Sequence, residues 1–152
     1  MTHPTALKVQ QRLRDHGLDV TVSELADSTR TAPEAAAAVG VEVGQIVKSL
    51  VFADGGGPIL VLCAGDRRVD TARLGEDVRA AKADEVREAT GFAIGGVPPL
   101  GHDRSIRTVV DASLRRFETV WCAAGTPHAV FEVGTEALIA AIPAAIVRDV
   151  SG

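Results

Sequence analysis

The sequence predicts a single α+β domain of mixed α/β character, spanning residues 1–152, in which a curved, partly barrel-like and mostly antiparallel sheet is flanked by helices. Strand-like apolar runs outnumber long helical segments, and hairpin-like strand pairs precede and follow a helical middle. Hydrophobic residues make up 46% of the chain, which is enough for a core. Only 3% of residues are aromatic, so we expect that core to consist mainly of aliphatic side chains.

Composition also excludes several classes of protein. No apolar run is long enough to span a bilayer, and the start of the chain lacks the pattern of a secretory signal, so a cytoplasmic location is expected. The net charge of −4 argues against coating a long nucleic acid by charge alone. Cys63 and Cys122 each lie in an apolar run and are expected to be buried, reduced thiols. The histidines show no ligand spacing, so neither a metal nor a cofactor is expected.

The first element is a predicted helix over Thr5–His16, with Pro4 near its first turn and Gly17 at its end. Leu7 and Leu13 mark only a thin apolar stripe on it. The helix is therefore expected to lie on the surface of the domain and not at its centre.

The second helix is signalled by the S/T-x-x-E spacing of Thr31–Glu34, which is typical of a capping box. It should continue through Val39 and end at Gly40. After a short turn, Gln45–Phe52 has the residue types of a strand, and Pro58–Cys63 is a continuous apolar run that should pair with it in a hairpin.

Lys48 stands out within the first of these strands. Side chains alternate across a strand, so Lys48 shares a face with Ile46, Leu50 and Phe52. A lysine on an apolar face must extend to the rim, pair with a buried acid, or point into a cavity that holds an anion. The strand alone leaves these three interpretations open.

The charged segment Val69–Thr90 is helix-prone, with Asp70 and Asp84 as candidate N-caps. It leads into a Gly/Pro-rich loop, Gly91–His102. Its two prolines contribute no N–H donors and its glycines permit close approach, so the loop could present the N–H groups of residues 95–97 to a carbonyl oxygen or oxyanion. The alternative is an ordinary connection between two elements.

The remainder of the chain alternates strands with short helical segments. His128 would lie at the mouth of a turn between two strands, where the alternative is a partly exposed turn histidine without a role. The expected elements are a strand at 106–111, a helical turn at 112–115, strands at 120–123 and 129–133, a helix from about 134 to 141 and a closing strand at 146–150.

Three motifs occur in an order that resembles the YbaK/EbsC family. They are Lys48 within Ile-Val-Lys-Ser-Leu-Val-Phe, the loop Gly-Gly-Val-Pro-Pro-Leu-Gly at Gly95–Gly101, and Gly-Thr-Pro-His at Gly125–His128. That family is related to the editing domain inserted in bacterial prolyl-tRNA synthetases. The resemblance extends from about Thr31 to the C-terminus and implies the same fold type.

The resemblance implies a trans-acting aminoacyl-tRNA deacylase that serves translation fidelity. Such a protein hydrolyses the ester between a wrong, small amino acid, with Ala or Cys as the leading candidates, and the 3′-terminal adenosine of a tRNA such as tRNA-Pro. The implied partner is the tRNA acceptor end, with an aminoacyl-tRNA synthetase as a second candidate. The implied catalytic residues are Lys48, Gly95, Gly96 and His128, and the implied substrate-binding residues are Ser49, Ile94, Val97, Pro98, Pro99, Gly101 and Gly125.

The match is incomplete at two points. Ser49 stands where some members of one subgroup carry asparagine, which leaves the amino acid substrate open. The glycine and proline of the loop motif can be read as Gly95 with Pro99, or as Gly95 and Gly96 with Pro98.

The sequence contains no evident Ser/His/Asp triad or carboxylate pair, which favours a mechanism without a protein nucleophile. We hypothesise that the 2′-hydroxyl of the adenosine helps to position the water. Two alternatives remain. One is a Cys–His hydrolase that uses Cys122 or Cys63 with His128, and the other is a catalytically silent adaptor that binds tRNA or a synthetase.

Overall fold

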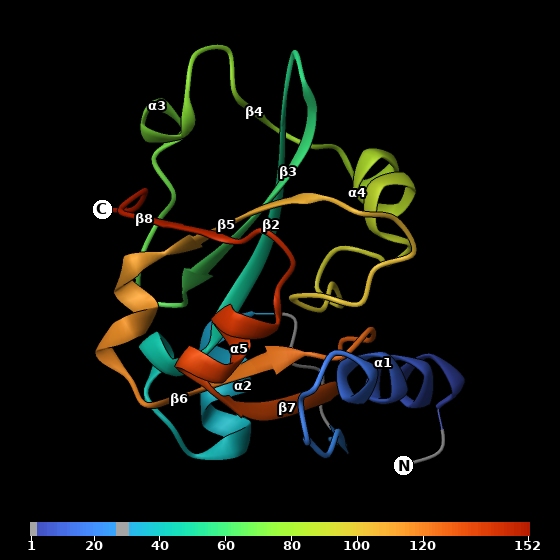
Figure 1. Cartoon of the computed structure of the whole chain (residues 1–152). Helices are drawn as coiled ribbons and strands as arrows, with labels where there is room; N and C mark the ends of the chain where they lie inside the picture. The colour runs from blue at the N-terminus through green and yellow to red at the C-terminus, as the bar shows by residue number, and fades with distance from the viewer. Residues whose placement is uncertain (1–2, 27–30) are drawn as a thin grey trace.

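The computed structural model describes residues 3–26 and 31–152 and contains two β-sheets (Figure 1). One sheet has the order β1-β7-β6 and the other β4-β2-β3-β5-β8. The strands are β1 (Ser23–Glu24), β2 (Val47–Asp54), β3 (Gly57–Ala64), β4 (Arg79–Ala80), β5 (Arg107–Asp111), β6 (Thr119–Ala123), β7 (Ala129–Gly134) and β8 (Ile146–Arg148). The α-helices are α1 (Pro4–Asp15), α2 (Ala32–Val39), α3 (Thr71–Leu74), α4 (Ala83–Thr90) and α5 (Thr135–Ala141), and Val43–Gln45 and Ala112–Arg116 form 3₁₀ turns.

The expected hairpin is confirmed and forms the centre of the larger sheet. β2 pairs with β3 along its whole length, from Val47 opposite Ala64 to Asp54 opposite Gly57. β5 and β8 then add to β3 in parallel, while the other described strand pairs are antiparallel.

The expected mixed α+β fold is confirmed, and the described strands form two sheets that do not close into a barrel. The described pairing between the two sheets is one isolated bridge, from Ile46 just before β2 to Trp121 of β6, so the described ladders do not close. Because a single bridge is not a ladder, one edge of β2 is left largely open between the two sheets.

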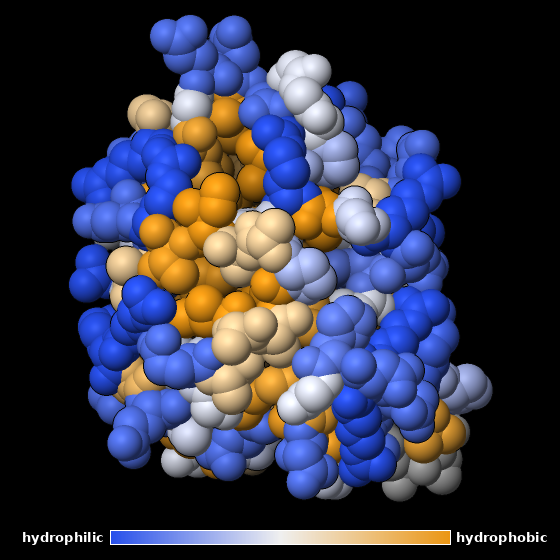
Figure 2. Space-filling view, viewed as in Figure 1, coloured by the Kyte–Doolittle hydropathy of each residue, from blue (hydrophilic) through white to orange (hydrophobic). Residues whose placement is uncertain are grey.

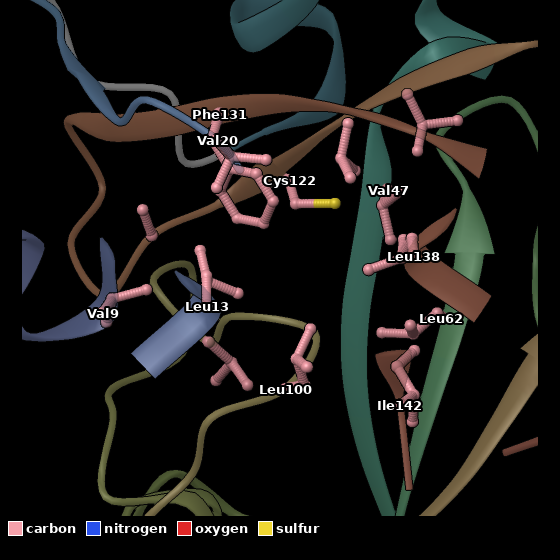
Figure 3. Packing of buried hydrophobic residues seen from close by; sticks show 14 of the residues in the cluster. Val9, Leu13, Val20, Val47, Leu62, Leu100, Cys122, Phe131, Leu138 and Ile142 are labelled. Atoms are coloured by element: carbon pink, nitrogen blue, oxygen red, sulfur yellow. The ribbon is translucent and has the colours of Figure 1, made fainter. Parts of the chain in front are cut away.

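Helix α1 has an exposed face, as expected of a surface helix, but its opposite face is part of the core. Ala6, Val9 and Leu13 are buried in the main hydrophobic cluster, whereas Leu7 is 45% exposed. Figure 3 shows Val9 and Leu13 in the same cluster as Phe131 and Leu100. The stripe runs at i, i+3 and i+7, and it was missed because alanine and valine carry part of it.

The helix boundaries follow their caps. Thr31 accepts a hydrogen bond from the Glu34 N–H at 3.3 Å, and Gly40 adopts φ 74°, which confirms the predicted start and end of α2. Asp84 is not an N-cap, because α4 begins after Lys82, whose N–H donates to the Glu85 carboxylate at 2.9 Å. The segment before α4 is helical only in α3.

Hydrophobic side chains fill the interior, and some of them are also exposed on the face described next. Figure 2 shows hydrophobic residues gathered in the middle of the face on which β5 and β8 lie in Figure 1, with hydrophilic residues on both sides. Cys63 and Cys122 are buried, free thiols, as predicted. Among the described residues, no helix is long and apolar enough to cross a membrane.

Candidate active site

A cavity of about 400 Å³ lies where the open edge of β2 faces three other segments. These are the start of α2, the loop at residues 94–97, and strand β6 with its neighbour β7. The lining is mostly apolar and consists of Thr31, Ala32, Pro33, Ala35, Val39, Ile46, Val47, Lys48, Ser49, Leu50, Gly65, Ile94, Gly95, Val97, Trp121, Cys122, Ala123 and Val130. Its size is that of a small-ligand site.

Lys48 is the charged side chain among the described lining residues. It is half-buried, and its Nζ donates a hydrogen bond to the main-chain carbonyl of Arg67. No described carboxylate lies within ion-pair distance of it. The carbonyl accepts a hydrogen bond from the ammonium group but carries no compensating negative charge.

Some residues of the Gly/Pro loop line the cavity and others do not. Ile94, Gly95 and Val97 line the cavity, and Gly95 has φ 89°, a backbone conformation that favours glycine. Gly96 does not line it. Its N–H donates to Ala93 at 3.0 Å, so the expectation that residues 95–97 all offer free N–H groups is wrong for Gly96.

Gly96 instead contacts the turn after β6. Its carbonyl accepts the Gly125 N–H at 2.8 Å, and a Cβ on Gly96 would lie 2.8 Å from the Gly125 carbonyl oxygen. Gly125 itself has φ 97° and packs against Thr5 and Val9 of α1. Gly96 is thus required by close backbone packing behind the cavity, and Gly125 by its positive φ and its side-chain neighbours on α1.

The proline end of the loop lies away from the cavity. Pro98 is buried and its carbonyl lies 2.6 Å from Nε2 of His102, while Pro99 and Gly101 line a second cavity of about 550 Å³. Burial lowers the pKa of His102, which favours the neutral imidazole.

His128 is exposed and is not among the described residues that line the first cavity. Its N–H donates to Thr126 Oγ1 at 3.3 Å, and its carbonyl accepts the Leu25 N–H at 2.7 Å. The structure therefore brings together Lys48, Ser49, Ile94, Gly95 and Val97 of the sequence-predicted residues, and it holds His128, Gly96, Gly125, Pro98, Pro99 and Gly101 outside the cavity wall.

Sequence reasoning missed Trp121 and the start of α2 as parts of the wall. Trp121 is half-buried against α2, and its Nε1 is buried without a described hydrogen-bond partner. It is the one tryptophan in a chain with few aromatic residues, which is a signal that the sequence did offer.

The cavity contains one thiol, Cys122, and burial raises the pKa of both Cys122 and Cys63. A protonated thiol is a poor nucleophile, and the exposed His128 is not positioned in the cavity with either cysteine, which argues against the Cys–His alternative. Among the described residues there is no cluster of three or more side chains that could hold a metal ion.

Comparison with known proteins places the cavity within a matched region. The family model of the aminoacyl-tRNA editing domain matches residues 26–141. A crystal structure of a candidate trans-editing enzyme for prolyl-tRNA synthetase is 46% identical, with a TM-score of 0.92, and the alignment covers 100% of this chain and 99% of that one.

Two curated proteins extend the comparison. The uncharacterized protein YwhH of Bacillus subtilis (strain 168) is 37% identical over 117 residues, which is 74% of each chain. The proline--tRNA ligase of Bacillus licheniformis (strain ATCC 14580) is 32% identical over 110 residues, 66% of this chain but only 19% of the ligase. The chain thus corresponds to a small part of that ligase.

Proposed function

Because this chain belongs to the aminoacyl-tRNA editing domain family, we propose that it hydrolyses the ester of a mischarged aminoacyl-tRNA in trans. The observation that carries the proposal is the mostly apolar cavity that Lys48 and the Gly95 loop line together. A cavity with one cation and a few main-chain donors suits a ligand that is small and apolar at one end and anionic at the other. The 3′ end of an aminoacyl-tRNA has this character.

The apolar walls support a small amino acid, with alanine or cysteine as the proposed substrate. Ile94, Val97 and Trp121 approach the cavity from the loop and from β6, and their side chains limit the space for a larger substituent. Exclusion by size alone contributes about 1–3 kcal/mol per methylene group, so the selectivity would be moderate.

Stabilisation of the tetrahedral intermediate is assigned to the loop. The N–H groups of Gly95 and Val97 make no hydrogen bond with the described residues, in contrast to that of Gly96. Donors held on a rigid loop do not have to reorganise as negative charge develops on the carbonyl oxygen, and one such donor is typically worth about 100-fold in rate.

The water must be activated without a protein base at the cavity wall. No carboxylate or imidazole is found among the described lining residues, and the one thiol is held protonated by its raised pKa. We therefore assign this role to the vicinal hydroxyl of the terminal adenosine. Lys48 binds a phosphate or ribose oxygen of the same nucleotide, which fixes the ester beside the loop. His128 could act only from outside the wall, on the tRNA.

The test is deacylation of tRNAs charged with alanine, cysteine, serine, threonine or proline. We expect rapid loss of one amino acid, and a decrease of about 100-fold or more for Lys48→Ala. Lys8→Ala is the matched control, because Lys8 is an exposed lysine of α1 paired with Asp103 at 3.7 Å. If wild-type protein leaves every ester as stable as in buffer but still binds the tRNA, the adaptor function replaces this proposal.

A further inference from the structure

The outer edge of β2 carries main-chain groups that point away from β3. Gly65 N–H donates to the carbonyl of Ile46 at 2.7 Å, so Ile46 directs its polar groups toward β3. On the opposite edge, Ala81 N–H donates to the carbonyl of Val51 at 3.0 Å. Main-chain groups alternate between the two edges of an antiparallel strand, so Ser49 directs its N–H and C=O outward, away from β3.

Neither neighbouring strand covers Ser49. β4 pairs with β2 only at Phe52 and Ala53, and the described pairing of β6 on this side is the bridge to Ile46. No described strand pairs with β2 at Ser49 along this edge. The edge is therefore open at Ser49, where it lines the cavity.

The partial exposure of Ser49 is consistent with a role for its main-chain N–H and C=O. The residue is half-buried, yet its Oγ is buried and has no partner among the described residues. The part that reaches the cavity is therefore not the hydroxyl group. The exposed part of Ser49 is thus its Cβ or its main chain, and the main chain at this position offers one donor and one acceptor on the outer edge.

We propose that the main-chain N–H and C=O of Ser49 bind the aminoacyl group by adding it to the edge of β2. The N–H donates to the ester carbonyl, and the C=O accepts from the α-ammonium group. An aminoacyl ester carries a donor and an acceptor at the spacing of one residue in an antiparallel ladder, so a single residue of the edge complements it. This inference rests on the proposed function and adds to it a requirement for the free α-amino group.

Pairing with the edge of β2 also fixes the face of the sheet on which the side chain of the substrate lies. Residues that pair across a ladder place their side chains on the same face of the sheet. The aminoacyl side chain would therefore lie on the face of Ser49 and Val47. Val97 and Cys122 are buried in the same cluster as Val47 and also line the cavity, so they would limit the size of that side chain.

The first test changes the substrate and leaves the protein unaltered. For the ester that the wild type hydrolyses, the des-amino counterpart is prepared on the same tRNA, for example propionyl in place of alanyl. The two esters hydrolyse at different rates in buffer, so each enzymatic rate is divided by its own spontaneous rate. We expect this acceleration to fall at least about tenfold for the des-amino ester, because the bond from a charged donor is lost.

The second test removes the N–H of Ser49. Proline is tolerated at an edge position whose N–H points outward, so Ser49→Pro should preserve the β2–β3 ladder. Ser49→Ala is the reference, because both variants lack the hydroxyl group and only alanine keeps the N–H. We expect kcat/KM of Ser49→Pro to be at least about tenfold below that of Ser49→Ala.

The outcomes separate the two proposals. Equal acceleration of both esters overturns the inference about Ser49 and leaves the deacylase function intact. Equal kcat/KM for the folded Pro and Ala variants does the same. If Ser49→Pro fails to fold, the substrate comparison on wild-type protein decides. If the wild type hydrolyses no ester, the proposed function itself fails, and this inference fails with it.

Discussion

The Gly125 N–H donates to the carbonyl oxygen of Gly96 at 2.8 Å, and this bond joins the loop at the cavity to the turn between β6 and β7. The turn packs in its own right against Thr5 and Val9 of α1. The cavity loop is therefore supported from behind by the N-terminal helix. A rigid loop of this kind is what preorganised N–H donors require.

The first prediction concerns Gly96→Ala. The new Cβ would lie 2.8 Å from the Gly125 carbonyl oxygen, so either the loop or the turn must move. We expect a loss of about 1–3 kcal/mol in the free energy of unfolding and a clear fall in deacylation. Denaturant titration and the tRNA assay measure the two effects.

Gly55→Ala is the control for this variant. A Cβ at Gly55 meets nothing within 4 Å, so its stability and deacylation should stay close to wild type. If Gly96→Ala behaved like Gly55→Ala in both measurements, the loop would not be supported as described.

Gly96 shows which part of the candidate site could be predicted from the sequence and which part could not. The motif indicates that a small residue is needed. The sequence alone does not distinguish a glycine that approaches a ligand from one that approaches a neighbouring backbone. The same limit applies to Lys48, whose place on an apolar face was predictable. Its partner, the Arg67 carbonyl, depends on a turn at the far end of β3.

Local signals were more reliable than long-range ones. The cap at Thr31, the helix end at Gly40 and the hairpin of β2 with β3 are determined by residues close in sequence, and all three are confirmed. Strands of two residues, such as β1 and β4, carry no periodicity of their own. The bridge from Ile46 to Trp121 joins distant segments, which explains why the wall formed by Trp121 was missed.

The second prediction compares two leucines of α1. Leu13 is fully buried in the main cluster, whereas Leu7 is 45% exposed on the same helix. Leu13→Ala should lower the free energy of unfolding by about 2–5 kcal/mol, because it removes buried methyl groups and leaves a cavity. Leu7→Ala should change it by less than about 1 kcal/mol. Equal effects in thermal or denaturant unfolding would show that α1 is not part of the core.

Asp111 is a fully buried carboxylate at the end of β5, and the third prediction concerns its removal. It accepts hydrogen bonds from the main chain of Val150 at 2.8 Å, from Ser151 Oγ at 2.7 Å, and from the N–H and hydroxyl of Ser113. Burial alone raises the pKa of Asp111, but these bonds outweigh burial and hold the pKa below its usual value. The carboxylate thus attaches the C-terminal segment to the sheet.

Asp111→Asn should destabilise the protein, and the size of the loss should depend on pH. An amide keeps one acceptor oxygen and places an NH₂ group against donors, so we expect a loss of about 2–4 kcal/mol near neutral pH. Because the folded pKa lies below the unfolded value of about 3.9, the stabilisation is complete above that value and declines as the pH falls through the folded pKa. Urea titrations from pH 7 to pH 3 should therefore show that the difference in unfolding free energy between wild type and Asp111→Asn becomes smaller toward acid.

Asp149→Asn is the control, since Asp149 is exposed, pairs with Arg73 at 3.1 Å and should contribute at most about 1 kcal/mol. A difference that stayed constant across this range would mean that the ionised form of Asp111 is not what holds the C-terminal segment.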